Sequence, residues 1–258
     1  MTHSSKQFYE HQYQDEIYAN AIDMEVHAFF PILDNFISKY QLEDKKCLEL
    51  GCGRGAFQDR VEKYFAIDYS FSTSKHLHKP FSVASGTALP FPDNTFDVLW
   101  THAVLEHIHD PQSGLEEIRR VLKSGGLLLL APAWHCAPWL ADGYPVRRYA
   151  DFNIWGKMYK AIIPLLDSKW IKMLSYMPIR IFWYFSGLFS NTPSNFHNKT
   201  LRANFTTYWM SDSDALNSMD QYDAIRWFTT RGDQCLTFPT TLQQLSARGL
   251  GIILQIQK

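Results

Sequence analysis

Three glycines within five residues, directly after a short apolar run, constrain this chain more than any other feature. Residues 46–50 read Lys-Cys-Leu-Glu-Leu and predict a buried strand, and Gly51, Gly53 and Gly55 follow it without Cβ atoms. Backbone of this kind can pass close to a ligand. Residues 56–64 predict a helix, whose first N–H groups would point at that ligand. The sequence therefore predicts a ligand-binding turn between a strand and a helix.

The turn by itself fits more than one adenine-containing cofactor. Gly51, Gly53 and Ala56 match the loose G-x-G-x-x-A fingerprint of dinucleotide-binding proteins, and Asp68 ends the next expected strand. An acid at about this distance can accept hydrogen bonds from a ribose diol. On these residues alone, a nicotinamide dinucleotide stays open as the ligand.

Further motifs argue against a nicotinamide dinucleotide as the ligand. Glu49 lies two residues before the first glycine. The other motifs are Ala88-Leu-Pro-Phe-Pro-Asp-Asn-Thr-Phe-Asp-Val-Leu-Trp100, His102-Ala-Val-Leu-Glu-His-Ile108 and Leu122-Lys-Ser-Gly-Gly-Leu-Leu-Leu-Leu130. In this combination the chain resembles the class I S-adenosylmethionine-dependent methyltransferases, especially the small-molecule subgroup with Leu-Pro-Phe and Leu-Glu-His signatures. The resemblance covers about residues 45–134 and implies S-adenosylmethionine as the cofactor.

The resemblance also implies which residues bind that cofactor. Glu49 would reach the amino group of the methionine part, directly or through water. Asp68 would hold the ribose hydroxyls, and Tyr69 would lie against the adenine ring. The methionine and ribose part would be surrounded by Gly51, Gly53 and Gly55.

One position departs from the family pattern. Where the family usually has an Asp that accepts from the adenine amino group, this chain has Ser85. A hydroxyl can accept the same hydrogen bond without charge assistance. We therefore expect the backbone of Thr87 and Ala88 to share adenine recognition. Thr101, which follows the fourth expected strand, is predicted to be a further cofactor contact.

Two histidines are the candidates for a catalytic base. His102 follows the fourth expected strand, at the carboxyl edge where ligands of open α/β sheets bind. A neutral imidazole there could accept a proton from an attacking hydroxyl, although cofactor contact or packing is an alternative. His135 follows the fifth expected strand and is the second candidate. His107, in the Leu-Glu-His motif, is interpreted as a residue that stabilises a loop.

The sequence predicts no metal site. The pairs His107/His109 and His76/His78 have no carboxylate or thiol cluster that completes a coordination set by spacing. The cysteines are scattered without a zinc or disulfide framework, and residues 1–7 have no apolar signal-peptide core, so we expect a cytoplasmic protein. The four cysteines are Cys47, Cys52, Cys136 and Cys235.

Alternating strands and helices predict the fold class. Strands are expected at about 46–50, 65–68, 82–84, 96–100 and 126–131, with helices at 56–63 and 111–122, a closing helix near 241–247 and a last strand within 249–257 at the sheet edge. This alternation indicates a doubly wound α/β fold, and the resemblance implies a seven-stranded, mainly parallel sheet.

We expect a single domain with four parts. Residues 1–44 are interpreted as a helical segment, in which Phe8, Tyr9, Tyr13, Ile17, Tyr18 and Val26 pack on the sheet or form a lid. Residues 45–134 would be the cofactor-binding core. Residues 135–235, which contain most of the tryptophans, would be an acceptor-binding cap insertion, and residues 236–258 would return to the sheet.

The most apolar stretch of the chain is residues 170–190. Lys172, Pro178, Arg180 and Gly187 interrupt it before it reaches the ~20 apolar residues that a bilayer requires. A buried cap helix is the favoured interpretation. An amphipathic helix at a membrane surface and an oligomer interface are the less favoured ones.

The acceptor is predicted only as a class. A net charge of −1 without a basic stripe argues against nucleic acid. Tyr208 and Trp209 beside Asp212 and Asp214 suit a sugar ring, although a solvated acidic face is an alternative. We expect methyl transfer to a small-molecule or glycan acceptor at oxygen. A catalytically silent S-adenosylmethionine-binding protein and a nicotinamide-dependent oxidoreductase are the alternatives, and the oligomeric state is left open.

Overall fold

The computed structural model describes residues 3–12, 28–190 and 192–258. The expected N-terminal helical segment is represented by α1 (His3–Gln12) and α3 (Phe29–Tyr40). Of the aromatic and apolar residues predicted to form its packing face, Tyr13, Ile17, Tyr18 and Val26 lie outside the described residues.

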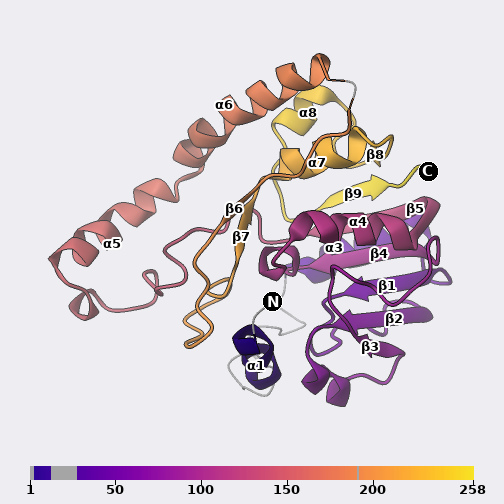
Figure 1. Cartoon of the computed structure of the whole chain (residues 1–258), viewed down its shortest axis with the longest axis horizontal. Coiled ribbons are helices and arrows are strands. Elements are labelled where there is room, and N and C mark those ends of the chain that lie inside the picture. The colour runs from indigo at the N-terminus through magenta and orange to yellow at the C-terminus, as the bar shows by residue number, and fades with distance from the viewer. Residues whose placement is uncertain (1–2, 13–27, 191) are drawn as a thin grey trace.

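A seven-stranded sheet forms the centre of the molecule (Figure 1). Its strand order is β3-β2-β1-β4-β5-β9-β8, and β9 is antiparallel to both of its neighbours. The strands are β1 (Lys46–Leu50), β2 (Lys63–Asp68), β3 (Phe81–Val83), β4 (Phe96–His102), β5 (Leu122–Ala131), β8 (Gln234–Cys235) and β9 (Ile252–Gln255). The doubly wound, mainly parallel fold class is therefore confirmed.

Apolar layers cover both faces of the sheet. On one face, α3 packs its buried Phe29, Leu33 and Phe36 against the buried Trp100 of β4. On the other face, α4 (Pro111–Val121) and α7 (Gln221–Thr229) bury Leu115 and Trp227 in a second core. The sheet is thus closed to solvent on both sides, as expected for parallel strands.

Two expectations about local structure are wrong. No helix forms over 56–64; instead, the amides of Gly55, Gln58 and Arg60 each bond a carbonyl three residues earlier. Strand β2 begins at Lys63, inside the range predicted as helix, and the residues between Gly55 and this strand form turns. The last strand is also not at the sheet edge, because β8 pairs outside it.

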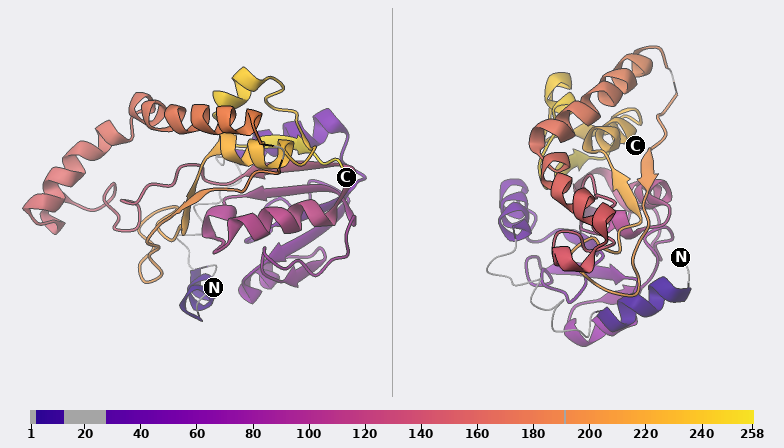
Figure 2. Two further views of the ribbon diagram at one scale, coloured as in Figure 1. Left: turned by 45° about the horizontal axis from the view of Figure 1, so that its top comes forward. Right: turned by 90° about the vertical axis from the view of Figure 1, so that its left-hand side faces the viewer.

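Between β5 and β8 the chain leaves the sheet. The α-helices of this part are α5 (Ile154–Leu166), α6 (Lys169–Leu188) and α7, and the short hairpin consists of β6 (Asn198–Thr200) and β7 (Asn217–Met219). The remaining short elements are α8 (Thr241–Leu245) and the 3-10 helices η1 (Phe71–His76), η2 (Leu105–His107) and η3 (Tyr149–Asp151). Figures 1 and 2 show α5 reaching beyond the rest of the molecule.

The interpretation of residues 170–190 as a buried helix is wrong in one respect. The stretch is helical, but its large side chains are mostly exposed: Trp170 is 73% exposed and Phe182 is 64% exposed. The apolar composition of the stretch suggested a helix and could not show whether protein covers its apolar face. The division of the chain into a lid, a core, a cap and a return segment stays a prediction.

All four cysteines are buried and free. Within the described residues, no helix is long and apolar enough to cross a membrane. The cytoplasmic location that the sequence suggested stays a prediction.

Candidate active site

A cavity of about 200 Å³ lies at the carboxyl ends of β1 and β4. These two strands are neighbours in the middle of the sheet, where the strand order reverses, and open α/β sheets bind ligands at this point. Two groups of residues line the cavity. The glycine-turn group is Glu49, Gly51, Gly53, Asp68 and Tyr69, and the histidine group is Tyr9, His102, His107, Tyr208, Asp212 and Asp214.

The glycine turn is held in a conformation that side chains would prevent. Gly51 has φ +78, and a Cβ built on it would lie 2.1 Å from Val104 Cγ2. The amide of Gly51 donates to Ile67 O over 2.7 Å, which fixes the turn against β2. Gly51 and Gly53 line the cavity, whereas Gly55 packs beside Leu77. The first two glycines of the turn therefore face the cavity, and their close approach to a ligand stays a prediction.

Asp68 joins the end of β2 to the glycine turn. The residue is 4% exposed, with Oδ2 accepting from the amide of Gly53 at 2.9 Å and Oδ1 accepting from the amide of Ser70 at 3.0 Å. Each carboxylate oxygen has a second lone pair, so Asp68 can hold a diol while it keeps both backbone bonds. The neighbouring Tyr69 is half-buried in the cavity wall.

Glu49 is a buried acid in the wall of the same cavity. It is 2% exposed, and the hydroxyl of Tyr64 donates to its Oε2. Burial raises the pKa of Glu49 to about 8, against the Tyr64 hydrogen bond, which lowers it. A ligand ammonium group beside this carboxyl would favour its ionised form. The narrow glycine cradle, the buried acid and the acceptor at Asp68 therefore fit the amino acid and ribose parts of S-adenosylmethionine.

Of the residues predicted to contact the adenine, Ser85, Thr87 and Ala88 do not themselves line the cavity. Ser85 Oγ lies 2.8 Å from Thr87 Oγ1, and the amide of Ala88 donates to Ser85 O at 3.0 Å. The cavity is lined by their neighbours Ala84 and Gly86. Thr101 is fully buried in β4, and its hydroxyl has no hydrogen-bond partner within the described part of the chain. Their roles as cofactor contacts stay predictions.

The structure separates the two predicted base candidates. His102 lines the cavity at the end of β4, and its ring stacks on Phe29 with ring centroids 4.3 Å apart. His135 does not line this cavity. Its ring stacks on Tyr176 at 3.7 Å, and its Nε2 lies 3.6 Å from Asp220 Oδ2. Burial lowers the pKa of His135 to about 4 although Asp220 opposes this, so the ring is neutral. A catalytic role for His135 stays a prediction without support from the cavity.

His107, interpreted from its motif as a loop-stabilising residue, lines the cavity. Its Nδ1 lies 3.2 Å from Asp214 Oδ2, and the hydroxyl of Tyr9 donates to the same oxygen at 2.9 Å. Although burial opposes the charge, the carboxylates of Asp214, Glu106 and Asp212 raise the pKa of His107 to about 10. At neutral pH His107 is therefore an imidazolium paired with carboxylates, and this pairing attaches α1 to the cavity wall.

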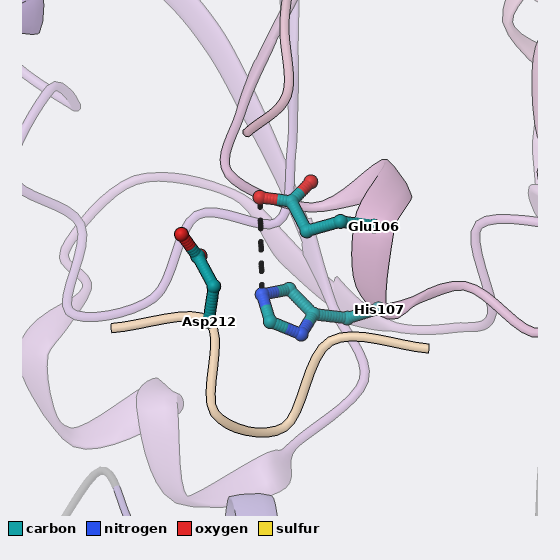
Figure 3. A group of neighbouring side chains, drawn as sticks. All are labelled: Glu106, His107 and Asp212. Atoms are coloured by element: carbon teal, nitrogen blue, oxygen red, sulfur yellow. Dashed lines mark ion pairs between the residues drawn. The ribbon is translucent and has the colours of Figure 1, made fainter. Parts of the chain in front are cut away.

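The same cluster has the composition of a possible metal site. Glu106, His107 and Asp212 each offer one ligand atom, and these atoms lie within 4.8 Å of one another (Figure 3). The ion pair between Glu106 Oε1 and His107 Nε2, at 3.9 Å, already uses two of them. A metal ion would require His107 to lose its proton. That the chain binds no metal ion stays a prediction.

Comparisons with known proteins agree with the cofactor-binding part of the chain. Residues 48–130 match the methyltransferase domain family. An uncharacterised methyltransferase of Schizosaccharomyces pombe is 31% identical over 136 residues, which cover 42% of this chain and 49% of that protein.

Two relatives have names that refer to a quinone. The demethylmenaquinone methyltransferase of Corynebacterium efficiens is 36% identical over 94 residues, covering 34% of this chain and 41% of that protein. A ubiquinone biosynthesis O-methyltransferase of Parvibaculum lavamentivorans is 29% identical over 102 residues, covering 34% of this chain and 40% of that protein. The chain thus spans about half or less of the length of these three curated relatives.

Proposed function

We propose that this chain, which belongs through residues 48–130 to the class I S-adenosylmethionine-dependent methyltransferases, transfers a methyl group to an oxygen atom of a small-molecule acceptor. The observation that carries the proposal is the single cavity lined by both residue groups. The glycine-turn group suits the cofactor, and the histidine group offers polar side chains beside it.

The glycine-turn group would bind and orient S-adenosylmethionine. Gly51 and Gly53 would let the backbone approach the ligand, Glu49 would face its ammonium group, and Asp68 would hold its ribose hydroxyls. When bound, this cofactor supplies a methyl group that is already activated on sulfur. The protein's main contribution would be to position the acceptor in line with that methyl group and to exclude water.

The histidine group would position the acceptor and handle its proton. In its neutral form, His102 can accept the proton of an acceptor hydroxyl. The His107 imidazolium, fixed by Asp214 at 3.2 Å, can donate a hydrogen bond but has no free lone pair for a proton. We therefore assign proton acceptance to His102 and orientation of the acceptor to His107. Tyr9, bonded to Asp214, would bring α1 over the acceptor as part of a lid.

The named relatives support a small-molecule acceptor, since both names refer to a quinone. Within this class, a sugar-like or glycan acceptor also stays in the proposal. Tyr208, Asp212 and Asp214 line the cavity together, and an aromatic ring beside carboxylates suits a polyhydroxylated ring. The acceptor atom is proposed as oxygen because a base candidate, His102, lies in the cavity wall.

The proposal can be tested in two steps with the native chain. Calorimetry should detect binding of S-adenosylmethionine and no comparable binding of NAD. Transfer of labelled methyl groups should then be measured over a panel of phenols, hydroxylated quinones and sugars. Binding of NAD in place of S-adenosylmethionine would overturn the cofactor assignment. Cofactor binding with no transfer to any panel member would instead favour a catalytically silent binding protein.

A further inference from the structure

Helix α6 is anchored to the molecule through polar contacts on one side. Arg180 is 4% exposed and donates from Nε to both carboxylate oxygens of Asp220, at 3.0 and 2.9 Å. Its Nη1 donates to the carbonyl oxygens of Leu245 and Ala247 at 2.9 and 3.1 Å. Tyr176, one turn earlier, stacks on His135. The inward face of α6 is therefore fixed by a buried ion pair and a ring stack.

The outward side of α6 carries large apolar side chains. Trp170 and Leu174 are 73% and 66% exposed, and further along the helix Phe182 and Phe185 are 64% and 55% exposed. Surface helices normally bury their apolar stripe and expose their polar one. Helix α6 has the opposite arrangement, so its apolar face lacks a covering layer within the described residues.

Helix α5 continues this surface. Its exposed apolar side chains recur at helical spacing and are Ile154, Trp155, Met158, Ile162 and Leu165. The two helices follow each other directly, and α5 projects beyond the rest of the molecule (Figures 1 and 2). We call α5 and α6 together the helical arm. Exposed apolar surface of this extent marks an interaction site.

The charge of this part of the chain indicates what the arm contacts. Residues 144–189 contain seven Lys and Arg and two Asp, a net charge of +5, in a chain whose net charge is −1. The remaining residues therefore carry −6. Lys157 is exposed among the apolar side chains of α5, and Lys172 pairs with Asp167 at the start of α6. A positive charge beside exposed Trp and Phe is complementary to an anionic lipid surface.

We propose that the helical arm docks on the surface of an anionic lipid bilayer, with the apolar stripes of α5 and α6 lying among the lipid headgroups and upper acyl chains. Neither helix can span a bilayer, so the arm lies in the interface. A symmetric contact between two copies of the arm would bring together two surfaces that each carry an excess of positive charge. This inference does not depend on the proposed methyl transfer, because it concerns a surface outside the cavity.

Vesicle flotation with the full chain tests the proposal. The protein should float with vesicles of phosphatidylcholine mixed with phosphatidylglycerol, and more weakly at high salt or with phosphatidylcholine alone. Lipids brominated in the upper acyl chain should quench its tryptophan fluorescence. The double variant Trp155→Ser with Trp170→Ser should bind anionic vesicles at least about tenfold more weakly, because two large apolar side chains are lost.

Matched variants distinguish docking through the helical arm from nonspecific hydrophobic adsorption to vesicles. Phe71→Ser with Leu242→Ser removes two side chains that are 67% and 77% exposed elsewhere, and it should leave flotation unchanged. Lys157→Glu should weaken binding to anionic vesicles, whereas Lys199→Glu, on the exposed strand β6, should not. Thermal unfolding and S-adenosylmethionine affinity should stay native in all of these variants. Absence of flotation with anionic vesicles, equal losses in the control variants, or self-association through the arm without flotation would overturn the proposal.

Discussion

The glycine-turn group comes from one stretch of chain between Glu49 and Tyr69, whereas the histidine group combines α1, the end of β4 with η2, and residues 208–214. The first group is fixed by backbone bonds such as those from Gly51 to Ile67 O and from Gly53 to Asp68. The second depends on side-chain contacts between distant segments. The proposed cofactor side of the cavity is therefore built locally, whereas the proposed acceptor side exists only once distant segments are folded together.

The largest loss of cofactor binding is expected from a substitution at Gly51, where an added Cβ would be closest to a neighbouring side chain. Gly51→Ala places a Cβ 2.1 Å from Val104 Cγ2 in a left-handed conformation, so the turn must shift. We expect S-adenosylmethionine binding to be lost and the free energy of unfolding to fall by about 3 kcal/mol, from left-handed strain plus overpacking. Calorimetry and urea unfolding measure the two effects.

Gly125→Ala is the matched control for this substitution. Gly125 has φ +80, but a Cβ there meets nothing within 4 Å in the described structure. The control should lose only about 1–2 kcal/mol of stability and should keep cofactor affinity. Equal losses of affinity in both variants would mean that backbone strain, and not close approach to the ligand, explains the effect at Gly51.

The next effect tests the separate roles proposed for His102 and His107. If His102 accepts the proton, His102→Ala should lower the turnover number about 10²–10⁴-fold with little change in cofactor affinity. His107→Ala should mainly raise the Michaelis constant for the acceptor, because it removes an orienting imidazolium. The exposed neighbour His109 provides the control His109→Ala. Loss of cofactor affinity in His102→Ala, with turnover preserved at saturation, would make His102 a cofactor contact.

The two groups also differ in how far the sequence could predict them. The turn was predictable because its residues are contiguous and each has a chemical reason at its position. The contact of Tyr9 with Asp214 joins residues 205 positions apart, and no local pattern signals such a pair. His107 stood in a recognised motif, but its charge follows from carboxylates that only the fold brings near it.

Sequence patterns also failed where one residue type has two structural uses. The apolar positions of α6 predicted a helix, but a stripe of Trp, Leu and Phe has the same period whether it is buried or exposed. The helix predicted after the glycine turn is replaced by turns, and β2 begins at Lys63, earlier than the sequence pattern indicated. Sheet order beyond β5 depends on β8, a two-residue strand that is too short to leave a pattern.

A smaller effect is expected at Asp68. Asp68→Ala removes charge-assisted hydrogen bonds worth about 1.5–3 kcal/mol, so affinity for S-adenosylmethionine should fall about 10–100-fold in calorimetry. Asp233→Ala is the control, because Asp233 is equally buried at 4% exposure but bonds Arg119 Nε at 2.8 Å, outside the cavity. Both variants should be less stable, and only Asp68→Ala should bind poorly. An equal fall in affinity would show that stability, and not ribose contact, is measured.

The smallest effect concerns the protonation of Glu49. Its pKa is about 8 in the folded chain against a reference value of 4.5, so between these pH values the folded state binds a proton that the unfolded state lacks. Stability from this group must therefore fall as pH rises from 4.5 to 8. Binding of the cofactor ammonium needs the carboxylate, so affinity should rise about tenfold between pH 6 and 7, where the α-amino group of the cofactor is still protonated, with proton release near pH 7. Glu49→Gln should abolish the proton release and should flatten the pH dependence of cofactor affinity in calorimetry and of the free energy of unfolding. Glu43→Gln changes an exposed acid and is the control, which should leave both pH dependences unchanged. Unchanged proton release in Glu49→Gln would place the titrating group elsewhere and remove Glu49 from the ammonium site.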